Sequence, residues 1–211
     1  MDVVIKNTIS SFDPSQAGWQ FMWGILLVGL SGLGIVVERF LYIYVRSSKN
    51  RDKFLLDFGR LIADKKFEEA VTLCKDSKLP IAAVMSAIVS ARDKGKEGMT
   101  AAADATFLTE APRVNRYLSL ITLIASLATL MGLSGTIFGL IYTFDAVANK
   151  PAAERPTALA QGIAVCMGTT LIGLGCAIPL MFLQGFLSLF SERVIQEMEE
   201  KSLKVINSLA V

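Results

Sequence analysis

The sequence contains no histidine and only three cysteines. Without imidazole, a histidine proton relay and a histidine-based metal site are both excluded. The cysteines (Cys74, Cys166 and Cys176) have no paired spacing, so no disulfide framework is indicated. We interpret all three as structural and predict neither a metal site nor a cofactor. The sequence also lacks a set of nucleophile and base, which argues against an enzyme.

Charge is missing from three long stretches, residues 14–37, 117–144 and 156–191. Each exceeds the roughly 20 apolar residues that cross a hydrocarbon core of about 30 Å. A chain in lipid must satisfy its own backbone hydrogen bonds, which a helix does within one segment. The sequence therefore predicts an all-α integral membrane protein with three transmembrane helices.

Basic residues indicate how the chain is oriented in the membrane. Segment 46–116 holds fourteen of the 21 lysines and arginines, whereas segment 145–155 holds two and the tail before Pro14 holds one. Because cytoplasmic connections are enriched in lysine and arginine, the long segment is predicted to be cytoplasmic. The N-terminus and the connection between the second and third spans are then outside, and the C-terminus is cytoplasmic.

The long cytoplasmic segment is expected to be helical. Apolar residues recur at helical spacing between residues 54 and 74. Pro80 is expected to open a further helix, Ile81 to about Ala91, because proline suits the first helical turn. Gly95 and Gly98 are expected to break it. A third helix is expected to begin near Thr100 and to run into the second span, with a kink or break at Pro112.

The second and third spans each carry a stripe of uncharged polar residues. Threonines in the second span recur every seven residues, which is nearly two helical turns, so they share one face. Small and polar residues of the third span fall within one narrow arc. Such stripes suit the lining of an ion path. The residues that we assign to this lining are Thr129, Thr136, Thr143, Thr169, Thr170 and Gln184.

Two threonines of these stripes are expected near the middle of the membrane. Thr136 lies nine residues before Asp145, or roughly 14 Å from the outer end of its span. Thr170 lies fourteen residues after Pro156, or roughly 21 Å along its span. The two helices can therefore place hydroxyl groups at one level.

Other residues of the spans favour structural roles. Small residues let membrane helices approach closely, and proline kinks a helix. The residues that we assign to helix packing are Gly132, Gly135, Gly139, Gly173 and Pro179. Glu38 and Arg39, at the end of the first span, are expected to anchor it at the membrane interface. A membrane threonine can also simply bond to the carbonyl one turn earlier, so a structural scaffold without an ion path stays open.

Four parts of the chain carry a resemblance to a known family. These are residues 35–40, residues 66–74 with 79–84, residues 128–139, and residues 162–164 with 170–179. Residues 128–139 (ATLMGLSGTIFG) are similar to the family's second-span signature, APLLGLLGTVxG. In order and over nearly the whole chain, the sequence resembles the ExbB/TolQ/MotA proton-channel family, and within it the ExbB and TolQ branch.

The resemblance implies a fold and a mechanism. Family members form homopentamers of long helical hairpins in the bacterial inner membrane, around two single-span partner helices of the ExbD or TolR type. Proton flow onto and off one membrane aspartate of each partner drives rotation. The work passes to a periplasm-spanning protein such as TonB or TolA, and no nucleic acid is involved. The family's functional threonines map onto Thr136 and Thr170.

The sequence departs from the family pattern at two positions. Thr129 replaces the signature proline of the second span, and Val165 replaces the glutamate that ExbB and TolQ members carry directly after Gly-Ile-Ala. The carboxylate of the ion path is then expected to come from the partner. A Na⁺-driven subunit and a specialised gliding or secretion motor subunit are the alternatives within the family.

These arguments give a linear layout of the chain. It comprises an N-terminal periplasmic or interfacial segment (1–13), transmembrane helix 1 (14–45), a cytoplasmic helical region (46–115), transmembrane helix 2 (116–145), a periplasmic connection (146–156), transmembrane helix 3 (157–191) and a cytoplasmic C-terminal helix (192–211).

Overall fold

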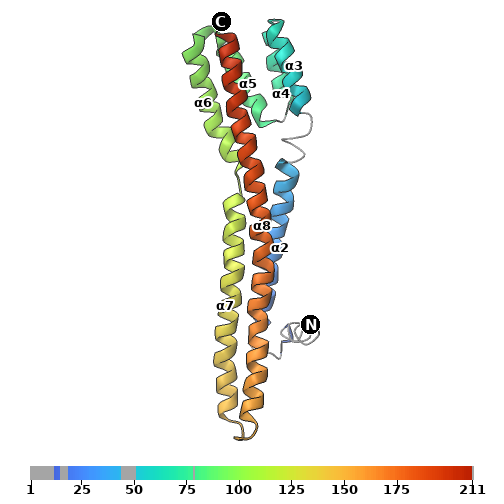
Figure 1. Ribbon diagram of the computed structural model, residues 1–211, viewed down its shortest axis with the longest axis vertical. Helices are drawn as coiled ribbons and strands as arrows, with labels where there is room; N and C mark the ends of the chain where they lie inside the picture. Colours follow the sequence, from blue (N-terminus) through green and yellow to red (C-terminus); the bar gives the residue numbers. More distant parts are fainter. Residues whose placement is uncertain (1–11, 15–18, 44–50, 78, 211) are drawn as a thin grey trace. The chain divides into compact units, whose positions relative to one another are not determined.

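The computed structural model describes residues 12–14, 19–43, 51–77 and 79–210. Within these residues the regular structure is helical and contains no strand (Figure 1). The helices are α2 (Trp19–Leu41), α3 (Arg51–Ala63), α4 (Phe67–Asp76), α5 (Pro80–Ser90), the short 3₁₀ helix η2 (Arg92–Lys94), α6 (Gly95–Val114), α7 (Leu118–Ala148) and α8 (Arg155–Leu209).

Three helical stretches are long and apolar enough to cross a membrane. They are α2, the run Arg92–Ala148 that contains α7, and α8. The predicted all-α fold with three membrane-spanning helices is confirmed. Some residues of the predicted layout lie outside the described part of the chain. They are residues 1–11 of the N-terminal segment, residues 15–18, 44 and 45 of the first span, residues 46–50 and 78 of the cytoplasmic region, and residue 211.

The chain divides into two compact units. One, which we call the spanning unit, comprises Met1–Val37 and Ser119–Gly185; the other, the charged unit, comprises Glu38–Leu118 and Phe186–Val211. Helix α8 contributes its first part to the spanning unit and its last part to the charged unit.

The spanning unit is built from α2, α7 and the first part of α8. Helices α7 and α8 are antiparallel neighbours joined by a short connection (Figure 1). Its outward faces carry large apolar side chains, such as Leu27, Ile141 and Phe182, which are each about two-thirds exposed. Such a surface is unfavourable in water and suits lipid, where the helices need only satisfy their own backbone hydrogen bonds.

The charged unit has a conventional hydrophobic core. Its centre is α5, which is apolar around most of its circumference and buries Val84, Met85 and Ile88 completely. A helix that is apolar on every side belongs in an interior. Phe58 of α3, Met99 of α6 and the end of α8 complete this core. As predicted, Pro80 is the first residue of α5.

The prediction for the segment before the second span was wrong in detail. Helix α6 begins at Gly95, five residues before Thr100, because Gly95 adopts a φ of +71° that glycine tolerates and that turns the chain into the helix. Pro112 lies inside α6, and the break comes after it, at residues 115–117. There Tyr117 has a φ of +67°, and the Ser191 hydroxyl donates to the Asn115 side-chain oxygen at 2.6 Å.

Candidate functional site

Helices α7 and α8 meet at the backbone carbonyl of Gly132. The hydroxyl groups of Thr169 and Thr170 each lie 3.1 Å from this oxygen and are placed to donate to it. The Thr169 hydroxyl also lies 2.8 Å from the Cys166 carbonyl, so its single proton serves one of the two acceptors at a time. Two neighbouring threonines of one helix thus converge on one carbonyl of the other.

Glycine makes this convergence possible. A Cβ on Gly132 would lie 3.1 Å from the Thr169 carbonyl oxygen and 3.2 Å from the Thr170 Cα. A Cβ on Gly173 would lie 2.7 Å from the Ala128 carbonyl oxygen, closer than real Cβ atoms approach backbone. Gly135 similarly faces Thr169. The absence of side chains therefore lets the two backbones come into direct contact, as small residues do in membrane helix pairs.

Thr136 also contacts the Gly132 carbonyl, through its backbone N–H. In the continuous helix α7 its N–H is four residues after Gly132 and is therefore directed at the same carbonyl. Its hydroxyl donates to the Leu133 carbonyl at 2.7 Å. The structure thus brings Thr136, Thr169 and Thr170 together around Gly132, and we call these four residues the Gly132 cluster.

Helix α2 covers only one side of α7. The rings of Phe21 in α2 and Phe138 in α7 lie 5.7 Å apart between centroids, and Gly32 approaches Ile124 closely. At 100° per residue, Phe138 and Ile124 lie to one side of Gly139, and Thr129 and Thr136 lie to the other. The half-buried threonines of α7 are therefore on the flank away from α2.

Helix α8 also contacts α2 on one side and carries its half-buried threonine on the other. Cys176 approaches Gly29 of α2, and by helical spacing Cys176 and Thr170 lie on opposite sides of Gly173. Thr170, like Thr129 and Thr136, is half-buried. The three residues therefore lie along a single polar flank of the α7–α8 pair that α2 leaves uncovered.

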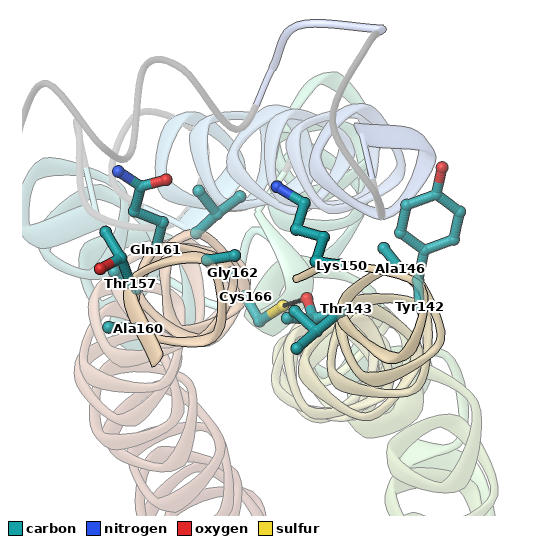
Figure 2. Close-up of a pocket in the computed structure, with 13 residues that line it drawn as sticks. Tyr142, Thr143, Ala146, Lys150, Thr157, Ala160, Gln161, Gly162 and Cys166 are labelled. Atoms are coloured by element: carbon teal, nitrogen blue, oxygen red, sulfur yellow. Dashed lines mark hydrogen bonds between the residues drawn. The ribbon is translucent and has the colours of Figure 1, made fainter. Parts of the chain in front are cut away.

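Thr143 has a different position, near the end of α7 where the chain turns into α8. It is buried, donates to the Gly139 carbonyl at 2.8 Å, and its hydroxyl lies 3.8 Å from the Cys166 sulfur. Figure 2 shows this pair between the two helices, at the base of a pocket of about 680 Å³. Thr143 thus lines the pocket and is buried between the helices. It does not lie on the polar flank with Thr136 and Thr170.

We call this pocket the outer pocket, after the predicted orientation of the chain. Among the described residues that line it, Lys150 is the one charged side chain. Tyr142, Thr157 and Gln161 supply its other large polar groups (Figure 2). Val165 also lines this pocket. A glutamate at this position would therefore place a carboxylate in the pocket, and valine leaves the lining positive.

The remaining predicted residues lie apart from the cluster. Thr129 donates to the Ala125 carbonyl at 3.2 Å. Gln184 is half-buried, fourteen residues or about 21 Å along α8 from Thr170, and Pro179 is exposed within α8. Gly139 faces Cys166 of α8.

Arg39, predicted together with Glu38 as an interface anchor, is buried within the charged unit. Its guanidinium lies 3.3 Å from the Glu38 carboxylate and stacks on the rings of Tyr42 and Tyr117. Glu38 itself is more than half exposed. The two residues therefore differ in environment although they are adjacent in sequence.

The chemistry of the Gly132 cluster depends on which acceptors its threonine hydroxyl groups donate to. The hydroxyls of Thr136 and Thr170 both donate to backbone carbonyls, so their oxygens present lone pairs to the exterior of the helix pair. Such a surface accepts hydrogen bonds from water or hydronium and ligates small hard cations. It carries no charge of its own. Among the described residues, no group of three or more potential metal ligands of the His, Cys, Asp or Glu type occurs.

Sequence reasoning missed the role of the Gly132 carbonyl. The stripe of threonines indicated which side chains are polar, but a hydroxyl's acceptor depends on the neighbouring helix. One signal was present, because Gly132 lies four residues before Thr136 and is therefore its backbone acceptor in a helix.

The sequence was compared with known families and proteins. The MotA/TolQ/ExbB proton channel family matches residues 76–200, more than half of the chain. The biopolymer transport protein exbB1 of Vibrio cholerae is 39% identical over 93 residues, which are 44% of this chain and 40% of that protein. A biopolymer transport protein ExbB homolog of Methanothermobacter thermautotrophicus is 24% identical over 188 residues, which are 89% of this chain and 66% of that protein.

The chain thus covers less than two-thirds of the length of each of these relatives. The family match nevertheless includes the whole of α5, α6 and α7 and most of α8, and with them the Gly132 cluster. This chain belongs to the MotA/TolQ/ExbB proton channel family.

Proposed function

We propose that this chain is the ring-forming subunit of an ion-driven motor in the bacterial inner membrane. Five copies would enclose single-span partners of the ExbD or TolR type, with the N-terminus periplasmic and the C-terminus cytoplasmic. The motor would pass its work to a periplasm-spanning protein of the TonB or TolA type. The observation that carries the proposal is the Gly132 cluster, on the polar flank that α2 leaves uncovered.

The proposed role of the cluster is to stabilise a positive species next to a partner helix. Thr136 and Thr170 donate their own protons to carbonyls, so their lone pairs face the path as acceptors. A hydronium ion, a protonated water chain or a cation gains from such acceptors, and an anion does not. A membrane potential of about 100 mV supplies roughly 2.3 kcal/mol per charge moved, so a few ions per step suffice to rearrange an interface.

The titrating group of this path would come from the partner. The three charge-free stretches contain no aspartate or glutamate, and Val165 occupies the position where a carboxylate would line the outer pocket. Ionisable groups within membranes usually mark ion pathways. We therefore expect a small protein with one span and a membrane aspartate to co-purify with this chain. Isolation of a stable, active assembly of this chain alone would contradict that expectation.

The coupling ion is proposed to be H⁺, as in the family's description. Na⁺ is the alternative, because oxygen lone pairs ligate hard cations equally well. Motor activity measured with and without Na⁺ at a constant total potential separates the two. Activity that needs Na⁺ and persists after the proton gradient is collapsed would replace H⁺ by Na⁺.

A structural scaffold is the rival function, and one observation favours it. The hydroxyls of Thr129, Thr136, Thr143, Thr169 and Thr170 all have backbone acceptors within the chain. If these bonds only stabilise helices, replacement of a threonine should weaken assembly and leave no specific functional defect.

The decisive experiment replaces Thr136 and Thr170 separately with valine, which keeps the shape and removes the hydroxyl. We expect both variants to assemble in the membrane at normal levels and to lose at least tenfold in ion-driven activity. Ser134→Ala is the matched control, because Ser134 is exposed and lies two residues from Gly132, on the far side of α7. Normal activity in both valine variants, or a loss that only follows reduced assembly, would favour the scaffold.

A further inference from the structure

The charged unit contains a second pocket, which the proposed ion path does not use. Its volume is about 620 Å³, and its walls come from the end of α2, from α4 and α5, and from the end of α6 with residue 116. Among the described residues, four basic side chains line it, together with one acidic side chain. The basic residues are Arg39, Lys75, Arg113 and Arg116, and the acidic residue is Glu110.

Arg39 is the most buried of the charged residues in this lining, with 4% of its side chain exposed. Its guanidinium lies 5.0 Å from the ring centroid of Tyr42 and 4.8 Å from that of Tyr117. The same guanidinium donates to the Arg113 carbonyl at 3.5 Å, but its Nε is buried and has no hydrogen-bond acceptor. A buried arginine with an unsatisfied donor is costly unless its charge is compensated.

Tyr117 brings a second arginine to the same place. The guanidinium of Arg116 lies 4.5 Å from the centroid of the Tyr117 ring, on which Arg39 also stacks. Tyr117 adopts a φ of +67°, a left-handed conformation that is costly for a residue with a Cβ. The strained residue, Tyr117, is therefore also the residue whose ring contacts two positive charges, those of Arg39 and Arg116.

The carboxylates near the pocket do not neutralise it. Glu110 pairs with Arg113, and Glu38 pairs with Arg39 from a position that is more than half exposed. In the part of the chain that the structure describes, neither Lys75 nor Arg116 forms an ion pair with a carboxylate. The four basic groups and the two carboxylates, Glu110 and Glu38, leave a net charge of +2. Because like charges in one pocket repel each other, a bound anion would stabilise them.

The chemistry of the lining selects a phosphate group. Arginine guanidinium groups match phosphate oxygens in a two-pronged geometry, and lysine adds a point charge. Arg39 lies two residues after the charge-free stretch 14–37, where the boundary of the membrane is expected. Basic pockets at the cytoplasmic ends of membrane helices bind the phosphates of anionic lipids.

We infer that this pocket, lined by Arg39, Lys75, Arg113 and Arg116, binds the phosphate group of an anionic ligand. An anionic phospholipid headgroup and free phosphate share the required chemistry. The bound phosphate compensates the charge around Tyr117 and so links the end of α2 to α4 and α6 within the charged unit. The site is independent of the ion path and holds whether or not the proposed motor function is correct.

The test uses the full chain, purified with any co-purifying partner. Lys75→Gln combined with Arg116→Gln removes two exposed charges from the pocket and leaves the buried Arg39 in place. Lys94→Gln combined with Lys96→Gln is the matched control, because it removes the same charge from exposed residues of the charged unit outside the pocket. With the protein in detergent, binding of short-chain phosphatidylglycerol, of short-chain phosphatidylcholine and of inorganic phosphate is measured in separate titrations by ³¹P NMR.

We expect the wild type and the control to prefer phosphatidylglycerol over phosphatidylcholine, and the pocket variant to bind phosphatidylglycerol about tenfold more weakly. That result assigns the site to a lipid headgroup. A tenfold loss that appears only with inorganic phosphate assigns it to the free ion. Equal binding of both probes by the pocket variant and the control variant would overturn the inference.

Discussion

The two units of this chain are held together by opposite means. In the charged unit, large apolar side chains such as Phe58, Met85 and Ile88 are completely or almost completely buried around α5. In the spanning unit, the closest contacts are made where side chains are missing, at Gly132 and Gly173, while large apolar residues point outward. One unit therefore hides its apolar surface, and the other exposes it.

The difference reflects the surroundings that each unit suits, water for the charged unit and lipid for the spanning unit. In water, burial of apolar area at about 25 cal/mol per Å² favours a core of large side chains. In lipid that driving force between helices disappears, and close backbone contact with interhelical hydrogen bonds takes its place. The hydroxyl bonds from Thr169 and Thr170 to the Gly132 carbonyl belong to this second kind of stabilisation.

The largest effect is expected from a side chain placed between the two backbones of the spanning unit. A Cβ on Gly173 would lie 2.7 Å from the Ala128 carbonyl oxygen, so Gly173→Leu forces α7 and α8 apart. We expect no assembled protein in detergent extracts analysed by size-exclusion chromatography. Gly175→Leu is the control, because a Cβ at Gly175 would point into open space. Wild-type yield of Gly173→Leu would show that the contact is dispensable.

A smaller effect is expected from a cavity in the charged unit. Ile88→Ala removes a completely buried side chain from the core, and such changes cost about 2–5 kcal/mol. Hydrogen exchange of the α5 amides in the intact protein should accelerate accordingly. Leu56→Ala, at a residue that is 65% exposed, should change the exchange by the equivalent of less than about 0.5 kcal/mol. Similar acceleration in both variants would mean that α5 is not the centre of the core.

The smallest perturbation is a chemical probe of Cys74, which changes no residue. Burial raises the pKa of the Cys74 thiol from 9.0 to about 12, so at pH 8 its thiolate fraction is about a thousandfold below that of a free cysteine. Because the raised pKa keeps the thiol protonated, alkylation should stay negligible until the pH rises well above 9 or the unit unfolds. Mass spectrometry of the labelled peptide measures the rate. Rapid labelling of the native protein at pH 8 would contradict the buried placement.

The sequence predicted the helices of the spanning unit better than their contacts. Charge-free stretches identify membrane spans because transfer of a charged side chain into the hydrocarbon core is costly whatever its neighbours in the helix are. The acceptors of the hydroxyls, in contrast, depend on how two helices pack. Thr143 therefore shared the stripe with Thr136 in sequence, although the structure buries it against Cys166.

In the charged unit the sequence failed at the junctions. Pro112 was expected to kink or break the helix there, yet α6 continues past it to Val114. The break between α6 and α7 comes instead at residues 115–117, where Tyr117 has a left-handed conformation. A tyrosine gives no local signal for such a conformation, which here is accompanied by stacking of Arg39 and Arg116 on its ring. Tertiary contacts of this kind cannot be read from neighbouring residues in the sequence.

The central claim is that a hydroxyl at the Gly132 cluster carries function beyond helix packing. The most direct measurement compares Thr170→Ser with Thr170→Val in proteoliposomes that contain the chain with its co-purifying partner, as ion flux per assembled complex. Serine keeps the hydroxyl that reaches the Gly132 carbonyl, and valine keeps only the shape. We predict flux close to wild type for Thr170→Ser and at least tenfold lower flux for Thr170→Val. Equal flux through the two variants would contradict the account.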